Sequence, residues 1–472
     1  MGENIRHNCG FCVAKTLHDA YSMIKGLQHR GREAAGIAAI GDKRIDVVKW
    51  SGGGEKFDLV DLHKILSPTK YHTFLGHVRY ATKGRKDRIL EDAHPHIIGG
   101  TKELRGDHEI ILDCEAVIVH NGQVSNKYLG ILGEEIMKLG CDSKKLLHYH
   151  ENYGPEKMIR EIPGAYSMAI ASKNNRDVVV MRDSLGIKPG VLGFKDGKCC
   201  VASEDQALIK NGADIIENLT PGSIYYLKPE GDYEKKKVIV DNKKRHCFFE
   251  WNYISEQGTV IDGISVRKVR HELGKELAKE YLFDDVDFVT FLPRCPEIAA
   301  RAYSERTDLP FLPVFYKMRS ERSFLGTTKE EREISIKQNL HLLPEIKEKN
   351  ILKDKTIIII DDSIVRGNNS KHAGKILYEE AEVKKVYFLS YTPKIGIIGK
   401  DGIQRGCEWG VDMPPEDNFI VKNKNDEEIS EALGMITKFL SDQGMMNAFE
   451  RAGMRNPREK LCYYCIGGER PC

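Results

Sequence analysis

The sequence predicts a two-domain protein, with a first domain of stacked antiparallel sheets and a second α/β domain built on a parallel sheet. At 472 residues the chain is too long for one ordinary hydrophobic core. Short β-type runs separated by turn residues fill residues 9–235, whereas strands and helices alternate through residues 245–472. Between these parts, around 228–246, the sequence is highly charged and poor in core residues.

Composition and charge limit the classes of partner. Hydrophobic residues make up 41% and charged residues 30%, and the net charge is +2, so neither a nucleic acid nor a membrane surface is expected as a partner. No apolar run reaches the roughly 20 residues that span a bilayer, and the polar start of the chain lacks a secretory signal. We therefore expect a cytoplasmic protein whose twelve cysteines are reduced.

The elements of the first domain follow from hydrophobic periodicity. Leu17, Tyr21, Ile24 and Leu27 share one face of a predicted helix. Predicted strands follow at 36–40, 47–50, 116–120, 166–171, 177–181 and 223–227, separated by turns such as Lys-Asn-Asn and Pro-Gly. This pattern is typical of antiparallel sheets with a helix packed on them.

The second domain alternates between the two kinds of element. Strands are predicted at 287–292, 356–362 and 386–391, with helices at 298–308 and 370–381 between them. A late helix is predicted over 426–440, with Ile429, Leu433, Ile436 and Leu440 on one stripe.

A candidate nucleophile lies close to the start of the chain. Cys9 precedes Gly10, and a thiol is a good nucleophile once it is partly ionised. Its own α-amino group, which titrates near pH 8, would serve as the base if residues 1–8 were removed as a propeptide.

Three further motifs follow Cys9-Gly10 in order: residues 27–31 (LQHRG), 76–82 (GHVRYAT) and 120–122 (HNG). Together they resemble the N-terminal-nucleophile glutaminases across the whole first domain. That resemblance implies an α+β sandwich of the αββα type in which Cys9 attacks the glutamine amide. It implies an oxyanion hole formed by Asn121 and the N–H of Gly122. The glutamine-binding residues that it implies are Arg30, Arg79, Tyr80, Thr82 and Asp142.

Each residue alone has a simpler explanation. Arg79 could form a surface ion pair, and His-Asn-Gly is a plausible turn. The stretch around Asp142 also departs from the family, because Ser-Asp-Thr-Glu is replaced by Cys-Asp-Ser-Lys at 141–144. The ordered set of motifs favours the glutaminase hypothesis.

The most informative stretch of the second domain is 356–370, TIIIIDDSIVRGNNS. Asp361 and Asp362 end a buried strand, where α/β sheets bind ligands, and such carboxylates can organise Mg²⁺. The glycine-bearing loop after them opens a helix, whose N-terminal N–H groups favour phosphate. The simpler alternative is a strand that ends in solvated acids.

The whole string resembles the phosphoribosylpyrophosphate (PRPP) motif of the type I phosphoribosyltransferases, and closely the amidotransferase form. It implies a PRPP and Mg²⁺ site made by Asp361, Asp362, Ser363, Arg366, Gly367, Asn368, Asn369 and Ser370, closed by a loop with Lys317, Arg319 and Arg322. Several positions depart from the family. Two usual threonines are Asn368 and Asn369, the pyrophosphate loop reads Pro-Arg-Cys-Pro at 293–296, and 255–258 read Ser-Glu-Gln-Gly.

The cysteines divide into two groups. Cys114, Cys141, Cys199 and Cys200 are expected to be small buried hydrophobes. Cys462 and Cys465 form a CxxC pair, which by itself fits zinc, a redox pair or an iron–sulfur cluster. Resemblance to the cluster-bearing glutamine PRPP amidotransferases adds Cys247 and Cys407, which implies a structural [4Fe–4S] cluster on four thiolates.

The family resemblance implies a reaction and partners. PRPP, glutamine and water would give 5-phosphoribosylamine, glutamate and pyrophosphate, the first step of de novo purine synthesis. It also implies a homotetramer and purine nucleotide effectors. Two alternatives stay open: an amidotransferase for another phosphorylated acceptor, and a non-catalytic paralogue that senses nucleotides or a cluster.

Overall fold

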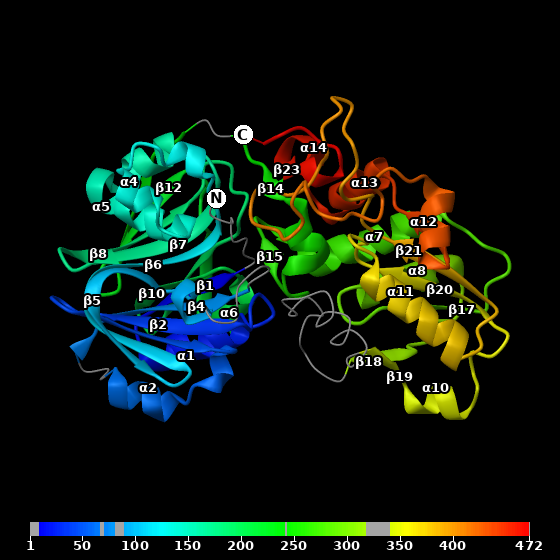
Figure 1. The fold of residues 1–472 in the computed structure, drawn as a ribbon, viewed down its shortest axis with the longest axis horizontal. Coiled ribbons are helices and arrows are strands. Elements are labelled where there is room, and N and C mark those ends of the chain that lie inside the picture. The colour runs from blue at the N-terminus through cyan, green and yellow to red at the C-terminus, as the bar shows by residue number, and fades with distance from the viewer. Residues whose placement is uncertain (1–8, 67–69, 81–88, 241–242, 318–339, 472) are drawn as a thin grey trace.

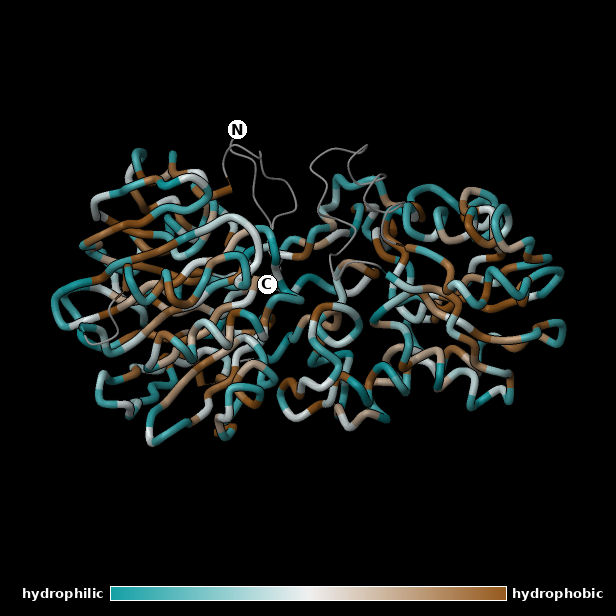
Figure 2. Tube along the Cα trace, turned by 90° about the horizontal axis from the view of Figure 1, so that it is seen from below, coloured by the Kyte–Doolittle hydropathy of each residue, from teal (hydrophilic) through white to brown (hydrophobic). Residues whose placement is uncertain are grey.

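The computed structural model describes residues 9–66, 70–80, 89–240, 243–317 and 340–471. The predicted propeptide, residues 1–8, lies outside this part of the chain. Figure 1 shows two domains side by side, the β-rich N-terminal domain and the α/β C-terminal domain. In the tube of Figure 2 apolar residues follow the inner strands, whereas the outer loops are mainly hydrophilic. No described helix has the length and apolarity needed to cross a membrane.

The first domain is a sandwich of strands with helices on both outer faces. Within the described residues thirteen strands pair in one antiparallel sheet, in the order β11-β9-β10-β1-β4-β2-β3-β6-β7-β8-β12-β13, with β5 on β6. The strands and helices are β1 (Gly10–Ala14), α1 (Leu17–Gly26), β2 (Ala34–Ile40), β3 (Ile45–Ser51), α2 (Leu59–Ile65), β4 (Thr73–Arg79), α3 (Ile89–Asp92), β5 (His96–Arg105), β6 (His108–Gln123), α4 (Glu134–Met137), α5 (Asp142–Glu161), β7 (Ala165–Ser172), β8 (Asn175–Arg182), β9 (Val191–Lys195), β10 (Lys198–Ala202), α6 (Asp205–Lys210), β11 (Asp214–Asn218), β12 (Ser223–Leu227) and β13 (Tyr233–Lys237).

Three separate cores show how the layers stack. Side chains alternate along β1, so that Phe11 and Val13 face the core between the two halves of the sheet. Cys12 and Ala14 face the opposite way, into the core beneath α1. A third core lies between the other half of the sheet and α5. The order helix, sheet, sheet, helix confirms the predicted αββα sandwich.

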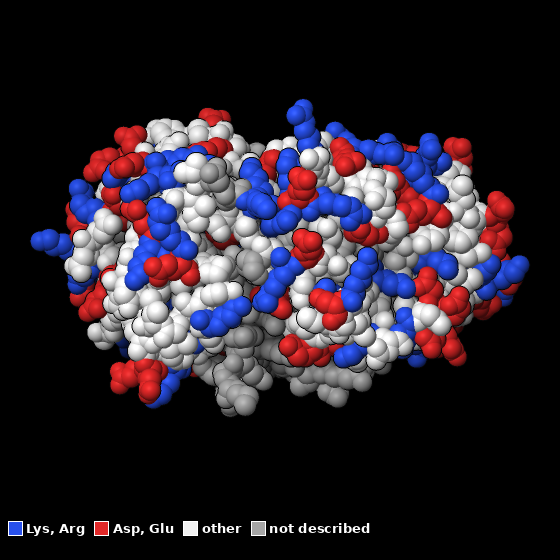
Figure 3. All heavy atoms as spheres, turned by 90° about the horizontal axis from the view of Figure 1, so that it is seen from above, with Lys and Arg blue, Asp and Glu red and all other residues white. Residues whose placement is uncertain are grey.

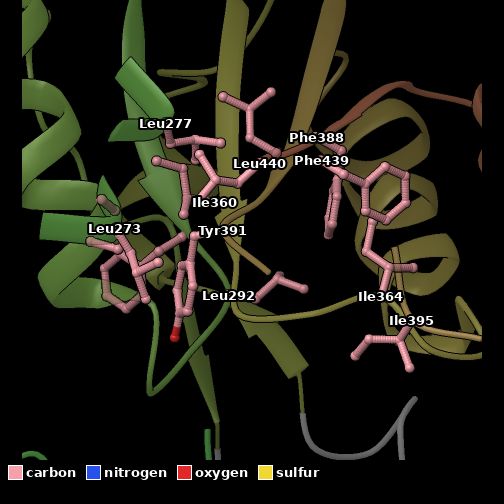
Figure 4. Close-up of a cluster of buried hydrophobic side chains, with 14 of the residues drawn as sticks. Leu273, Leu277, Leu292, Ile360, Ile364, Phe388, Tyr391, Ile395, Phe439 and Leu440 are labelled. Carbon is pink, nitrogen blue, oxygen red and sulfur yellow. The ribbon is translucent and has the colours of Figure 1, made fainter. Parts of the chain in front are cut away.

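The second domain is centred on a parallel sheet in the order β17-β20-β21-β22. All residues of β20 are buried, as expected for a parallel strand covered on both faces. Figure 4 shows Leu273 and Leu277 of α7 meeting Ile360 and Leu440 in this core. The elements are β14 (His246–Cys247), η5 (Glu250–Ile254), β15 (Val260–Ile261), β16 (Ile264–Ser265), α7 (Val266–Glu280), β17 (Phe288–Phe291), α8 (Glu297–Thr307), β18 (Phe315–Lys317), β19 (Leu340–Leu342), α10 (Pro344–Glu348), β20 (Thr356–Asp361), α11 (Asn368–Lys375), η6 (Ile376–Glu380), β21 (Lys385–Ser390), α12 (Asp426–Leu433), β22 (Ile436–Phe439), α13 (Asp442–Ala452), α14 (Pro457–Lys460) and β23 (Leu461–Cys462).

The helix predicted over 426–440 is wrong in its second half. Helix α12 ends at Leu433, because Gly434 takes a left-handed conformation with φ of 71°. The chain then enters β22, which pairs with β21 in the parallel sheet. Ile436, placed on the buried stripe of the predicted helix, is exposed.

The two domains meet along the segment that follows β13. Strand β14 pairs in parallel with β23, so the end of the chain returns to the domain boundary.

Acidic and basic side chains are interspersed over the face in Figure 3, as the small net charge leads one to expect.

Candidate active site

Cys9 lies directly before β1, with its side chain buried. Burial raises the pKa of the Cys9 thiol to about 11, and a hydrogen bond from the Tyr80 N–H and the charges of Arg79, Lys188 and Arg30 only partly oppose this. A thiol in this setting is protonated at neutral pH. It therefore needs a base before it can act as a nucleophile.

Asn121 and Gly122 lie near the end of β6. The Asn121 side chain is completely buried, and neither its Oδ1 nor its Nδ2 has a hydrogen-bond partner among the described residues. A buried side-chain amide without a hydrogen-bond partner lowers folding stability by roughly 1–3 kcal/mol, so its presence points to a ligand group that binds there. Gly122 has φ of 148°, and a Cβ at this position would lie 1.9 Å from the carbonyl oxygen of Ala165. Only glycine fits.

Two buried histidines support this strand end. The Nε2 of His77 lies 3.0 Å from the carbonyl oxygen of His120, and the Nδ1 of His120 lies 2.9 Å from Ser143 Oγ. Burial lowers the pKa of His77 to about 3 and also lowers the pKa of His120. Both rings are therefore neutral near pH 7, and His77 donates to the backbone just before Asn121. Sequence reasoning gave His77 no role, although it lies inside the GHVRYAT motif.

The predicted glutamine ligands Arg79 and Asp142 are buried and partly occupied. The Nη1 of Arg79 is 2.8 Å from Glu33 Oε2, and its Nη2 is 3.4 Å from Asp92 Oδ2, while its Nε has no hydrogen-bond partner in the described chain. Asp142 accepts the Val124 N–H at 2.8 Å. Thr82 lies outside the described residues. The glutamine-binding set stays a prediction.

Arg30 has partners that sequence reasoning did not foresee. Its guanidinium is fully buried, with Nη1 2.6 Å from Glu204 Oε1 and 3.0 Å from Glu250 Oε2. Its Nε donates to the carbonyl oxygen of Cys9 at 2.9 Å. Arg30 therefore holds the backbone of Cys9, and Glu250 reaches the Arg30 guanidinium from the second domain. Isolated acids at 204 and 250 carry no motif from which this contact could be predicted.

In the second domain the paired acids lie at the carboxyl end of β20. Asp361 and Asp362 are buried, and their pKa values are raised by burial, with the Asp362 carboxylate adding to the effect on Asp361. Lys317 lies near both carboxylates, and burial lowers its pKa. The two acids therefore form a site that a cation would stabilise.

The phosphate-type loop follows these acids. Gly367 has φ of 78° and precedes α11, which opens with Asn368, Asn369 and Ser370. The Nε of Arg366 is 3.0 Å from Asp417 Oδ1, and its guanidinium interacts electrostatically with the Tyr80 side chain of the first domain. The carboxyl-end site and the Cys9 site therefore face the same domain boundary. Arg319 and Arg322 of the predicted closing loop lie outside the described residues.

The divergent loop at 293–296 joins β17 to α8. Its Pro293–Arg294 peptide bond is cis, and the Cys295 thiol lies 3.5 Å from the carbonyl oxygen of Tyr253. Both Arg294 and Cys295 act electrostatically on Lys317. The departure from the family pattern therefore lies beside the paired acids.

The four predicted cluster ligands come together in space. Cys247 pairs with Cys462 across β14 and β23, and all four thiols, including Cys407 and Cys465, are buried. The pKa of Cys465 is raised by burial and further by the charges of the other three. In the described part of the chain no three or more His, Cys, Asp or Glu side chains are arranged as ligands of a single metal ion. Cys114, Cys141, Cys199 and Cys200 are buried elsewhere, as expected.

The fold and the two candidate sites together define an N-terminal-nucleophile glutamine amidotransferase joined to a phosphoribosyltransferase-type domain. A family model for a glutamine amidotransferase domain matches residues 110–228. A relative from Methanocaldococcus jannaschii named amidophosphoribosyltransferase is 31% identical, over 97% of this chain and 94% of its own length. One of the same name from Archaeoglobus fulgidus is 28% identical, over 96% of this chain and 94% of its own length. The chain belongs to the amidophosphoribosyltransferase family.

A solved structure supports the same assignment across both domains. The glutamine PRPP amidotransferase from B. subtilis complexed with ADP and GMP superposes with a TM-score of 0.77 at 25% identity, covering 98% of this chain and 97% of its own. The protein is thus an enzyme with glutaminase activity. The similarity covers nearly all of the chain, which does not favour either a changed acceptor or a non-catalytic paralogue.

The buried neutral His77 predicts a specific acid sensitivity. Because its folded pKa of about 3 lies below its unfolded value of 6.5, its contribution to stability is complete above pH 6.5 and is lost as the pH falls toward 3. Between pH 7 and pH 5 the linkage relation gives a loss of about 2 kcal/mol. In urea titrations, the free energy of unfolding should fall by about 2 kcal/mol less in His77→Gln than in wild type between pH 7 and pH 5. The exposed His18→Gln is the matched control. Parallel pH profiles for wild type and His77→Gln would contradict a neutral His77.

Proposed function

We propose that this chain catalyses the amidophosphoribosyltransferase reaction, with Cys9 and the 361–370 loop as the centres of its two halves. In the first half glutamine is hydrolysed to glutamate and ammonia. In the second half ammonia displaces pyrophosphate from C1 of PRPP and gives 5-phosphoribosylamine. The observation that carries the proposal is the buried side-chain amide of Asn121, which has no hydrogen-bond partner among the described residues, in a chain with a buried thiol at Cys9.

The glutaminase half starts from a protonated thiol. Removal of residues 1–8 would free the α-amino group of Cys9, which takes the thiol proton as the sulfur attacks the amide carbon. The resulting oxyanion would be held by Asn121 Nδ2 and the Gly122 N–H. Loss of one such donor typically lowers the rate by ~10²–10³-fold. When the tetrahedral intermediate collapses, the amide nitrogen takes the proton held by the α-amino group and leaves as ammonia, and a thioester remains on Cys9. Water then hydrolyses the thioester to glutamate and restores the thiol.

The substrate amino acid would be held by charged side chains around this centre. Arg79 offers a guanidinium with a free Nε, and Asp142 offers a buried carboxylate, which suits the carboxylate and ammonium ends of glutamine. Arg30 would contribute through the backbone of Cys9, since its guanidinium is already bonded to two carboxylates. Tyr80 would contribute through its N–H to the thiol.

The acceptor half would take place at the carboxyl end of β20. The N-terminus of α11 and the residues Gly367 to Ser370 would bind the 5-phosphate, while Asp361 and Asp362 would bind ribose hydroxyls. The carboxylates also suit Mg²⁺. Their pKa values are raised because two acids are buried side by side, and a bound cation would stabilise their charged forms. Mg²⁺ bound there would neutralise charge on the departing pyrophosphate. Positioning and charge stabilisation would supply the catalysis.

The four converging cysteines would hold a [4Fe–4S] cluster. The donor set suits this group, because four buried thiols lie together. They are Cys247 of β14, Cys462 of β23, Cys407 and Cys465. A cluster held there would tie the end of the chain to the segment that opens the second domain. Purine nucleotides are proposed as effectors, since the B. subtilis relative is complexed with ADP and GMP. The tetramer stays a prediction.

Removal of the nucleophile tests the division into two halves. Cys9→Ala should abolish glutamate release and glutamine-dependent pyrophosphate release, whereas ammonia-dependent pyrophosphate release should stay within about twofold of wild type, because the acceptor half does not use the thiol. Cys12→Ala is the matched control, because Cys12 is a buried cysteine of β1 that faces the core beneath α1. Equal loss of the glutamine-dependent and ammonia-dependent activities in Cys9→Ala would contradict the two-site proposal.

Removal of one cluster ligand tests the cofactor proposal. Protein purified without oxygen should contain iron and acid-labile sulfide, and Cys465→Ser should lose most of both, because a four-thiolate site is then incomplete. Cys200→Ser, which replaces a buried cysteine outside the set, should keep the wild-type content. Stoichiometric zinc without iron or sulfide in the wild-type protein would overturn the assignment in favour of a zinc site.

A further inference from the structure

The segment from Arg182 to Lys188, here called the junction segment, connects β8 to the strand pair that follows. Its shape is fixed by two buried charged side chains. The Asp183 carboxylate accepts the N–H groups of Leu185, Ile187 and Lys188 at 3.0–3.3 Å. The Arg182 guanidinium donates to the carbonyl oxygens of Gly186 and Lys188 at 2.9 and 2.7 Å. The junction segment is therefore a rigid part of the first domain.

The backbone of the junction segment holds the start of the second domain. The N–H groups of Arg245 and Cys247 donate to the carbonyl oxygens of Leu185 and Ile187 at 2.8 and 3.3 Å. Arg182 adds an ion pair across the boundary, with Nη2 2.8 Å from Asp262 Oδ2. Strand β14, which carries the proposed cluster ligand Cys247, is thus seated on the junction segment.

The side chain of Lys188 is buried near both Cys9 and Cys247. Only 1% of it is exposed, and its Nζ has no hydrogen-bond partner among the described residues. The anion next to it is Glu250, whose Oε1 is 3.6 Å away, beyond hydrogen-bond length. The positive charge of Lys188 acts on Cys9 on one side and on Cys247 on the other, opposing the rise that burial causes in the pKa of each thiol.

Glu250 joins Lys188 to the nucleophile. Its two carboxylate oxygens also receive the Arg30 guanidinium at 3.0 and 3.1 Å, and Arg30 in turn donates to the carbonyl oxygen of Cys9. Arg30 and Lys188 are balanced by Glu204 and Glu250, so that two buried cations meet two buried anions. Breaking one buried pair of this kind is strongly destabilising, because a buried charge is left without a partner. Glu250, supplied by the second domain, is the carboxylate that pairs with Lys188 among the described residues, whereas Arg30 also has Glu204.

We propose that Lys188 and Glu250 are positioning residues for the glutaminase reaction, through which the seated second domain holds the backbone of Cys9 in its attacking geometry. This inference rests on the proposed role of Cys9 as nucleophile. Glu250 belongs to the second domain, three residues after Cys247, whereas Arg30 and Lys188 belong to the first. A shift of β14 would move Glu250 away from Arg30 and release the Cys9 carbonyl. A misplacement of about 1 Å can cost ~10²-fold in rate.

The test compares Lys188→Met, Lys188→Arg and Glu250→Gln in the full chain, with mass spectrometry confirming that each mature protein starts at Cys9. Lys188→Met and Glu250→Gln should lower kcat for glutamate release by at least about tenfold, with KM for glutamine changing far less. Ammonia-dependent pyrophosphate release should stay near wild type, and Lys188→Arg should recover part of the loss. Lys64→Met, which breaks an exposed pair with Asp61, is the matched control and should behave as wild type.

The double variant Lys188→Met/Glu250→Gln separates positioning from simple loss of stability. It removes one charge of each sign, so its melting temperature should exceed that of Lys188→Met, while its glutamate release stays low. Recovery of glutamate release together with the melting temperature would overturn the proposal, since the network would then be structural only. Wild-type kcat in Lys188→Met and Glu250→Gln would overturn it as well.

A second readout keeps this inference separate from the proposed function. The rate at which iodoacetamide alkylates Cys9 depends on the placement and charge environment of the thiol and not on glutamine turnover. It should fall in Lys188→Met and recover in Lys188→Arg. If wild type releases no glutamate, the proposed function fails, and the alkylation rates alone decide the inference: a fall that Lys188→Arg reverses supports it, and equal rates overturn it.

Discussion

The buried contact between Arg30 and two carboxylates, Glu204 and Glu250, is the interaction on which the rest of the structure depends. Arg30 is completely buried, so its positive charge has to be balanced by anions close by. One carboxylate comes from each domain, and both lie within 3.0 Å of the same guanidinium nitrogen. Of the other two nitrogens, Nη2 donates to Glu250 Oε1 and Nε donates to the carbonyl oxygen of Cys9. The guanidinium that holds the Cys9 backbone is thus bonded across the domain boundary, because its contact with Glu250 comes from the second domain.

The two candidate sites and the cysteine group all border the residues of this contact. The Tyr80 N–H bonds the Cys9 thiol, while its side chain interacts with Arg366 at the end of the phosphate-type loop. On the other side, the junction segment holds β14, and β14 pairs with the returning end of the chain. Glutaminase site, acceptor site and cysteine group therefore share one boundary, which suits an enzyme that passes a small product from one domain to the other.

Much of the fold and of the site could be predicted because the decisive signals are local. Strands such as β20 are continuous apolar runs, and the turn from Asp361 to Ser370 combines acids, glycine and small polar residues in a single string. Cys9 and Asn121 belong to short motifs whose order identifies the family. The prediction of a helix over 426–440 was wrong in its second half, because Gly434 ends the helix and a strand follows. The apolar pattern there fits both kinds of element.

The remaining parts of the site could not be predicted, because they are single residues far apart in sequence. Glu204, Glu250 and Lys188 belong to no catalytic motif, and sequence alone does not tell a buried charge from a solvated one. His77 lies within a motif, yet its role as a neutral donor to the His120 carbonyl follows only from its burial. Arg30 illustrates the same limit, since its motif indicates importance but not its partners.

The central claim is that one chain couples glutamine hydrolysis to the transfer of ammonia to PRPP across this boundary. Glutamate and pyrophosphate release should be measured together, in protein purified without oxygen, with and without Mg·PRPP. The account predicts that glutamate release rises sharply when Mg·PRPP is added and that pyrophosphate appears in equal amount. Glutamate release that is indifferent to Mg·PRPP, with no pyrophosphate formed, would contradict it.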